Sequence, residues 1–325
     1  MSFPPPRYIQ LYPTFRCNQN CLFCSNEHLK TGDLALEKAL ELLDILFAGG
    51  VMEIDIAGGE PLLLDWMPEF TARANARGFE INLSTNGSRP GILERFSGAD
   101  KNLLKIGVSI EGGSAGTHNR ITQSGNFNAA VESIKILQAM GLEPIVKTVV
   151  NRHTMPDIPN IANMLREIGV ERYYLIHMDV MSADAAAGGD YIGYNDFIRF
   201  FKETKKIDHR PEILKVHASC FSRASIPEYA RCAGGVLKLS VLPDGSVFPC
   251  SLFNGNEEFR LGNIFQDGLA SILTNPRLAS FRNFRQNQCR VKGCENRQQC
   301  TGGCPAHGLC HYGNPDAVDI RCVTG

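Results

Sequence analysis

The chain has 325 residues and a formal net charge of −1, with 43% hydrophobic and 21% charged residues, which is typical of a globular protein with one large domain and a smaller appendage. It contains no run of Lys or Arg long enough to bind phosphates, no uninterrupted apolar stretch of about 18 residues, and no signal peptide at its start. We therefore expect a cytoplasmic protein that binds neither nucleic acid nor a membrane.

The twelve cysteines are distributed unevenly. Three lie within residues 17–24, none follows in the next 195 residues, and nine lie between Cys220 and Cys322. Because the cytosol keeps thiols reduced, this clustering favours metal ligation over a disulfide framework.

From residue 8 to about 206, short apolar runs alternate with amphipathic helical segments. The predicted strands are 8–14, 53–57, 80–84, 103–110, 144–150 and 172–178. The clearest predicted helices are 33–48, with Leu36, Leu40, Leu43 and Phe47 on one face, and 126–141, which ends at a capping glycine. Six β/α units predict either a doubly wound sheet or an incomplete barrel.

After about residue 207 the sequence becomes rich in Gly, Asn and Cys and loses its periodicity. A hairpin is predicted over 236–250, where Asp244-Gly245 supplies the turn. Such a loop-rich region buries little apolar surface, and we expect its nine cysteines to hold it together.

The unusual short sequences all follow predicted strands. They are the triple-cysteine loop, then 58–61, 85–87, 111–113, 151–153 and 178–181. Because active sites form beyond the carboxyl ends of parallel strands, these segments predict one shared cleft.

The three cysteines of the first loop, Cys17, Cys21 and Cys24, allow two interpretations. A zinc site would take His28 as its fourth ligand. A [4Fe–4S] cluster would take three thiolates and leave one iron open for a substrate or cosubstrate.

The spacing of Cys17, Cys21, Phe23 and Cys24 resembles the signature of the radical S-adenosylmethionine (SAM) enzymes. The resemblance covers residues 8–206 and implies an α/β fold, a partial (β/α)6 TIM-like barrel, which we assign to residues 1–210. It also implies that the open iron chelates SAM. An electron from the cluster then cleaves SAM to a 5′-deoxyadenosyl radical, which abstracts hydrogen from the substrate.

The same resemblance implies a set of SAM contacts. The sequence "AGGEP" matches the GGE motif that meets the SAM amino group, and two later segments resemble those that face the ribose and the carboxylate. The residues implied are Phe23, Gly58, Gly59, Glu60, Ser84, Asn86, Ser109 and Arg120.

The C-terminal cysteines resemble the SPASM extension of radical SAM enzymes, which we assign to residues 211–325. Four residues separate Cys289 from Cys294, where the family usually has two. The resemblance implies two auxiliary [4Fe–4S] clusters and thus three in all. One would be held by Cys232, Cys250 and Cys304 with Cys220 as candidate fourth ligand, and the other by Cys289, Cys294, Cys300 and Cys322. Cys310 is left over, and two zinc knuckles are the alternative.

SPASM enzymes are best known for two-electron oxidations of ribosomal peptides and proteins, so we expect a dehydrogenation or crosslink on such a substrate. An external electron donor such as flavodoxin or ferredoxin is implied. Since the barrel begins near residue 8, we expect no N-terminal leader-binding domain, so a separate protein or the groove itself would recognise the peptide. Ser251 stands where sulfatase maturases have Asp, which argues against that reaction.

Other functions stay open. They include a small-molecule dehydrogenase or epimerase, in which Cys310 would be the catalytic hydrogen donor, a tetrapyrrole-modifying enzyme, and a non-catalytic iron–sulfur or zinc protein. The polar candidates for facing the substrate are Asp179, Asp184, Asp190 and Tyr191.

Overall fold

The computed structural model describes residues 4–25, 29, 32–206, 211–289 and 291–322. The strands in this part of the chain form one sheet in the order β10-β9-β8-β1-β2-β3-β4-β5-β6-β7. In chain order they are β1 (Tyr8–Leu11), β2 (Glu53–Ile56), β3 (Glu80–Thr85), β4 (Leu104–Ser109), β5 (Ile145–Val150), β6 (Arg172–His177), β7 (Glu212–Val216), β8 (Lys238–Val241), β9 (Ser246–Phe248) and β10 (Gly262–Asn263).

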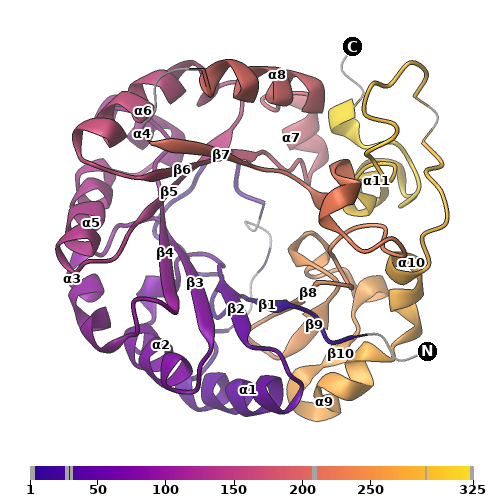
Figure 1. Ribbon diagram of the computed structural model, residues 1–325, viewed down its shortest axis with the longest axis horizontal. Helices are drawn as coiled ribbons and strands as arrows, with labels where there is room; N and C mark the ends of the chain where they lie inside the picture. Colours follow the sequence, from indigo (N-terminus) through magenta and orange to yellow (C-terminus); the bar gives the residue numbers. More distant parts are fainter. Residues whose placement is uncertain (1–3, 26–28, 30–31, 207–210, 290, 323–325) are drawn as a thin grey trace.

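Strands β1 to β7 are parallel and neighbours in the sheet follow the order of the chain. They curve into an open ring, the partial barrel that the β/α alternation and the family resemblance predicted (Figure 1). All six predicted strands are confirmed within a few residues. The seventh, β7, was not predicted.

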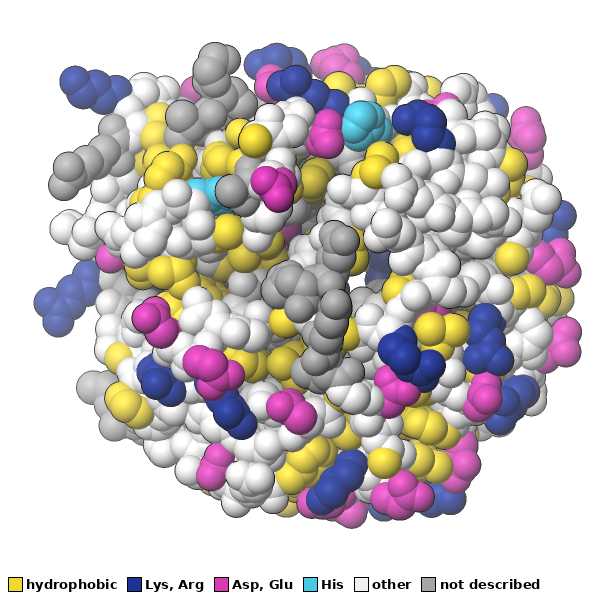
Figure 2. Space-filling model, turned by 180° about the vertical axis from the view of Figure 1, so that it is seen from behind, with side chains coloured by type: hydrophobic (Ala, Val, Ile, Leu, Met, Phe, Trp, Pro, Cys, Tyr) yellow, Lys and Arg dark blue, Asp and Glu magenta, His cyan; other side chains and the backbone are white. Residues whose placement is uncertain are grey.

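The larger helices lie outside the ring of strands (Figure 1). In chain order the helices are α1 (Leu36–Ala48), α2 (Met67–Ala76), α3 (Pro90–Leu93), α4 (Ala115–Thr122), α5 (Phe127–Ala139), α6 (Ile158–Glu167), α7 (Ala183–Ala187), α8 (Tyr194–Thr204), α9 (Ile264–Leu273), α10 (Ala279–Arg282) and α11 (Pro305–Tyr312). None in the described ranges is long and apolar enough to cross a membrane. On the face shown in Figure 2, acidic and basic side chains are interspersed around the rim.

The buried face of α1 differs from the predicted one. Ala39, Leu42, Leu43 and Leu46 are buried, whereas Phe47 is 60% exposed. Of the predicted stripe, Leu43 is buried and Leu36 and Leu40 are partly buried against the core, so the prediction was wrong only at Phe47.

The predicted hairpin is formed by β8 and β9, which are antiparallel. Its turn needs a glycine, since Gly245 has φ of +84°, and the Asp244 carboxylate accepts a hydrogen bond from the Ser246 N–H. Strand β8 also pairs in parallel with β1, so the cysteine-rich region extends the barrel sheet. In Figure 1 this region fills the sector between β7 and β1.

Two groups of buried side chains form the interior. One packs the barrel strands against their helices, and the other lies in the C-terminal region. The second contains Cys220, Cys232, Cys250 and Cys304 among aromatic residues such as Phe221. The cysteines are thus part of the core of the C-terminal region, as its loop-rich sequence led us to expect.

Candidate active site

The loop that follows β1 carries three cysteine side chains. Cys17 and Cys24 are exposed and Cys21 is half-buried, while the alternative zinc ligand His28 lies outside the described residues. Burial raises the pKa of the Cys21 thiol, and the negative charges of Glu111 and of the other two thiolates raise it further. Deprotonation of these thiols would therefore be favoured by a bound cation, and thiolates are the ligands that iron–sulfur clusters and zinc take.

Backbone hydrogen bonds fasten this loop to the barrel. The Leu22 N–H donates to the Ile121 carbonyl at the end of α4 (3.1 Å), and the Gly59 N–H after β2 donates to the Thr14 carbonyl (2.9 Å). The barrel thus positions the cysteine loop from both sides.

Two glycines allow the chain after β2 to approach the cysteine loop this closely. A Cβ atom at Gly58, whose φ is +140°, would lie 2.4 Å from the Thr14 carbonyl oxygen, and one at Gly59 would lie 2.1 Å from the Arg16 carbonyl oxygen. The sequence predicted a close approach of the backbone to a ligand here. The structure shows that the cysteine loop itself makes this approach.

A cavity of about 380 Å³ opens beside the three cysteines, at the carboxyl ends of the first five strands. Six of the predicted cofactor-binding residues line it with the cysteines: Phe23, Gly58, Gly59, Ser84, Asn86 and Ser109. The ends of the first five strands meet in this cleft, whereas the predicted segments 151–153 and 178–181 do not line it.

Polar side chains in this cavity are held by neighbours. The Asn86 amide donates to Oδ1 of Asn18 (2.9 Å) and lies 3.9 Å from Sγ of Cys17. The hydroxyl of Ser84 accepts a hydrogen bond from Nζ of Lys147 (2.7 Å). The cavity therefore combines oriented polar groups with the apolar surface of Phe23 and can hold a ligand that has both kinds of group.

The other two predicted contacts do not line the cavity. Glu60 is fully buried, and its carboxylate accepts hydrogen bonds from the Leu62 N–H, the Thr85 hydroxyl and the Asn86 N–H. Arg120 is exposed on α4. A role of either residue in binding SAM stays a prediction.

Two residues near the cavity were not chosen from the sequence. Glu111 lines it and is buried, and this burial raises the pKa of its carboxyl to about 8 even though the Val149 N–H donates to it (3.1 Å). Lys147 lies behind Ser84, and burial lowers the pKa of its amine. Glu111 belongs to one of the strand-end segments, so the signal that identified Ser84 could also have found it.

In the C-terminal region, four buried cysteines form one group. Cys220, Cys232, Cys250 and Cys304 lie in the same buried cluster, and burial together with the nearby Cys250 and Cys304 thiols raises the pKa of the Cys232 thiol. Because burial raises the pKa of the Cys220 thiol, a bound cation would be needed to keep the whole group as thiolates. Cys220 thus lies where the candidate fourth ligand was expected.

Four other cysteines, Cys289, Cys294, Cys300 and Cys322, line a separate cavity of about 200 Å³. The backbone N–H of Gly302 donates to Sγ of Cys300 (3.3 Å), a contact of the kind that tunes thiolate ligands. The longer spacing between Cys289 and Cys294 does not prevent them from reaching the same cavity.

Cys310 lies apart from both groups. It is exposed on α11 and lines a third cavity, of about 710 Å³. The structure thus places Cys310 where it can face a ligand.

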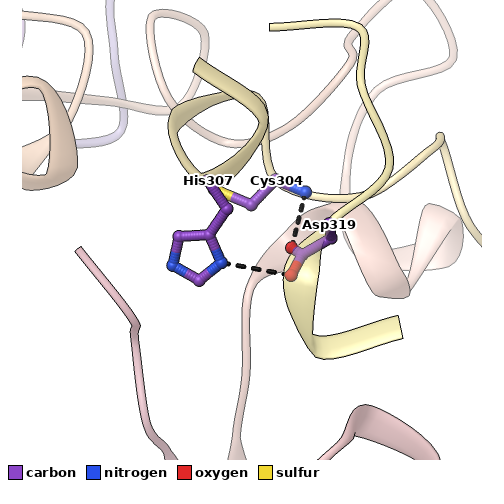
Figure 3. A group of neighbouring side chains, drawn as sticks. All are labelled: Cys304, His307 and Asp319. Atoms are coloured by element: carbon purple, nitrogen blue, oxygen red, sulfur yellow. Dashed lines mark hydrogen bonds and ion pairs between the residues drawn. The ribbon is translucent and has the colours of Figure 1, made fainter. Parts of the chain in front are cut away.

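Beside the buried cysteine group lies a network of charged side chains. Asp319 accepts a hydrogen bond from the Cys304 N–H (2.9 Å) and faces Nδ1 of His307 at 3.1 Å (Figure 3). Arg321 binds both oxygens of Asp319 and also Asp179, which follows β6. The network therefore ties the cysteine-bearing C-terminal segment to the barrel.

Burial opposes ionisation of Asp319, but Arg321 and His307 hold its pKa well below the ordinary value. Burial and Arg321 likewise oppose protonation of His307, yet Asp319, Cys304 and Asp179 raise the pKa of His307 to about 9. Cys304, His307 and Asp319 are close enough to hold a metal ion, but Arg321 already supplies the positive charge between the carboxylates. We interpret these residues as an ion-pair network.

Two of the residues expected to face a substrate have polar partners in the protein. Asp179 binds Arg321 at 2.8 Å, and Asp190 lies 2.9 Å from Nε2 of His153. Asp184 is exposed and Tyr191 lines a cavity beside α8.

Comparisons with known proteins agree with this architecture. Residues 11–168 match the radical SAM superfamily model, and residues 232–301 match the SPASM model, an iron–sulfur cluster-binding domain. The chain is 26% identical to the antilisterial bacteriocin subtilosin biosynthesis protein AlbA of Bacillus subtilis (strain 168), over 95% of this chain and 69% of that protein. It is 25% identical to the PqqA peptide cyclase of Xanthomonas campestris pv. campestris (strain 8004), over 99% and 88% of the two chains.

Solved structures show the same fold. Streptococcus suis SuiB bound to the precursor peptide SuiA superposes with a TM-score of 0.80 at 15% identity, covering 99% of this chain and 77% of SuiB. Native anSMEcpe with bound AdoMet and Cp18Cys peptide gives a TM-score of 0.75 at 18% identity, covering 98% and 94% of the two chains.

Proposed function

Because this chain belongs to the radical SAM enzymes that carry a SPASM iron–sulfur domain, we propose that it oxidatively modifies a ribosomally made peptide or protein. The two relatives named above act in bacteriocin biosynthesis and in peptide cyclisation. The product we expect is a dehydrogenated residue or an intramolecular crosslink.

One observation carries this proposal: the cavity of about 710 Å³ is lined by residues that neighbour, in sequence, cysteines of both kinds of group. Its lining includes Ser25, which follows Cys24 of the cysteine loop, and Ser251, which follows the buried Cys250. Ala306, two residues after Cys304, closes another side. A substrate in this cavity would contact residues next to both groups, which suits an oxidation by two one-electron steps.

The cysteine sets fit three [4Fe–4S] clusters. Cys17, Cys21 and Cys24 would hold the SAM-binding cluster. Cys220, Cys232, Cys250 and Cys304 would form one auxiliary site, and Cys289, Cys294, Cys300 and Cys322 the other. When bound, the clusters would supply one-electron chemistry: an electron for SAM cleavage at the first set of cysteines, and at the auxiliary sets an acceptor for one electron from the substrate. One hydrogen atom of the substrate would leave with 5′-deoxyadenosine, and the second would leave as a proton and this electron. The substrate therefore loses two hydrogen atoms in all.

The protein's own residues position the cosubstrate. Ser84, Asn86 and Ser109 offer polar groups in the cavity beside the cysteine loop, and the buried carboxyl of Glu111 offers a further hydrogen-bonding group. Phe23 provides an apolar face. Ser251, the residue after Cys250, carries no ionisable base.

The test is co-expression of the chain with the small peptides encoded beside its gene, followed by mass spectrometry. We expect one peptide to lose the mass of two hydrogen atoms per modification, and one 5′-deoxyadenosine to be formed per event. A reductant such as flavodoxin or ferredoxin, and a separate peptide-recognition protein, are added in parallel. SAM cleavage without any peptide product would contradict the proposed substrate class.

A further inference from the structure

The cavity of about 710 Å³ contains a side chain that the proposed function does not explain. Asn254 lines this cavity at the end of a short turn (Ser251–Phe253) that follows Cys250. It is only 7% exposed, and among the described residues neither Nδ2 nor Oδ1 of its amide has a hydrogen-bond partner. A buried amide without partners destabilises a fold, so such groups are rare unless something else binds them.

The turn itself does not need this amide. The backbone N–H of Asn254 donates to the Ser251 carbonyl (3.1 Å), which closes the turn without the side chain. The side chain of Asn256, two residues later, does have a hydrogen-bond partner. Its Oδ1 accepts a hydrogen bond from the Glu258 N–H (3.1 Å), which is a structural role.

The rest of the cavity indicates what would bind there. Leu252, Phe253 and Leu309 give it apolar walls, and the exposed Glu257 and Glu258 lie at its surface. The described lining residues include no Lys or Arg, although Arg260, outside the lining, lies 3.6 Å from the Glu257 carboxylate. With two carboxylates against this one cation, the surface of the cavity favours a further cationic group. An Asn amide carries a donor and an acceptor side by side, which matches the N–H and C=O groups of a peptide backbone.

We propose that Asn254 is a positioning residue that hydrogen-bonds the backbone of an extended peptide substrate, and that this peptide carries a Lys or Arg facing Glu257 and Glu258. This inference rests on the proposed peptide-modifying function. Both polar atoms of Asn254 are shielded in the free protein, so the peptide has to displace a neighbouring side chain. Leu29 packs close to Gly255, the residue after Asn254. A Cβ atom at Gly255 would lie 2.8 Å from Cδ2 of Leu29.

The experiment uses the reconstituted holoenzyme with SAM, immobilised under anaerobic conditions, and a random dodecapeptide library as the probe. We expect recovered peptides to be enriched at least threefold in Lys or Arg. Asn254→Leu, which keeps the branched shape but removes the hydrogen-bonding atoms, should lower the recovery about tenfold, the loss expected for about 1.4 kcal/mol of hydrogen bonding. The surface double variant Glu257→Gln/Glu258→Gln should abolish the enrichment in basic residues.

The matched control is Asn256→Leu. Melting temperature separates the two asparagines: Asn256→Leu should lower it, whereas Asn254→Leu should leave it unchanged or raise it. A similar fall in both variants, or unchanged peptide recovery with Asn254→Leu, would assign Asn254 a structural role and overturn the proposal. Equal recovery of basic and acidic peptides would overturn the charge assignment. The iron content and SAM cleavage of the wild-type enzyme test the proposed function separately.

Discussion

Cys17 and Cys24 are exposed beside a cavity of about 380 Å³, whereas Cys220, Cys232, Cys250 and Cys304 are buried among aromatic side chains. The first group has three thiols and open space, and the second has four thiols and none of its members exposed. The difference shows that cysteine serves two purposes in this chain. A three-cysteine loop leaves room for an exchangeable ligand, while a closed four-cysteine group can replace the hydrophobic core that a loop-rich region lacks.

The largest effects are expected when one cysteine of each group is replaced. Cys17→Ala should lower the formation of 5′-deoxyadenosine by at least about 1,000-fold, equivalent to about 4 kcal/mol of lost catalysis. Its iron content should fall from about twelve to about eight per chain, because the auxiliary groups stay intact.

Cys232→Ala should act differently, since this thiol is part of the C-terminal core. We expect a lower melting temperature as well as a loss of iron, both measured on the reconstituted protein. Equal melting temperatures for Cys17→Ala and Cys232→Ala would contradict the distinction between the two groups.

The next largest effect is expected on the free energy of unfolding, when the network around Arg321 and Asp319 is disrupted. Arg321→Leu leaves Asp319 buried beside Cys304 without its main cation, so the free energy of unfolding should fall by about 3–5 kcal/mol in urea titrations. The matched control is Lys206→Ala, which removes an exposed ion pair with Glu203 and should cost less than about 0.5 kcal/mol. A small effect of Arg321→Leu would show that the network does not hold the C-terminal region to the barrel.

The raised pKa of the Glu111 carboxyl predicts that the stability of the apo protein depends on pH. Burial raises its pKa to about 8, above the ordinary 4.5, so the folded state keeps a proton that the unfolded state releases. Stability should therefore be complete below about pH 4.5 and decrease by at most about 1.4 kcal/mol per pH unit up to about pH 8. Glu111→Gln, which cannot ionise, should flatten this slope in chemical unfolding under reducing conditions. An unchanged slope would mean that Glu111 stays ionised in the fold.

A smaller effect tests how the cysteine loop is held. Gly59→Ala places a Cβ atom 2.1 Å from the Arg16 carbonyl oxygen, so the loop must move, at a cost of about 1–3 kcal/mol. We expect weaker SAM binding by calorimetry. Gly91→Ala is the control, since no atom lies within 4 Å of the added methyl group. Equal SAM affinity in the two variants would contradict the role given to Gly59.

The smallest effect is expected for Cys310→Ala. Because Cys310 lies outside both auxiliary groups, the variant should keep its full iron content, measured by iron and sulfide analysis. Loss of about four irons would make it a cluster ligand instead.

The barrel was predictable from the sequence because each of its first six strands is a short apolar run followed by a helical segment. Strand β7 was missed, since its sequence "EILKV" is short and carries two charges. The strand-end segments also predicted the cofactor cavity, because parallel strands bring their carboxyl ends together.

The remaining site features depend on contacts between distant parts of the chain. Asp179 and Arg321 are 142 residues apart, and no local pattern indicates that they pair. The same holds for Cys220, whose carbonyl accepts a hydrogen bond from the Thr301 N–H (2.8 Å) and which thereby reaches the other buried cysteines. Spacing motifs identified the cysteines, but only the fold separates Cys220 from Cys310.

Anaerobic reconstitution followed by addition of SAM and dithionite tests the central claim most directly, because it counts the clusters and detects the chemistry together. We predict about twelve irons per chain and formation of 5′-deoxyadenosine. Near-stoichiometric zinc, or no 5′-deoxyadenosine from a protein that holds its iron, would contradict the account.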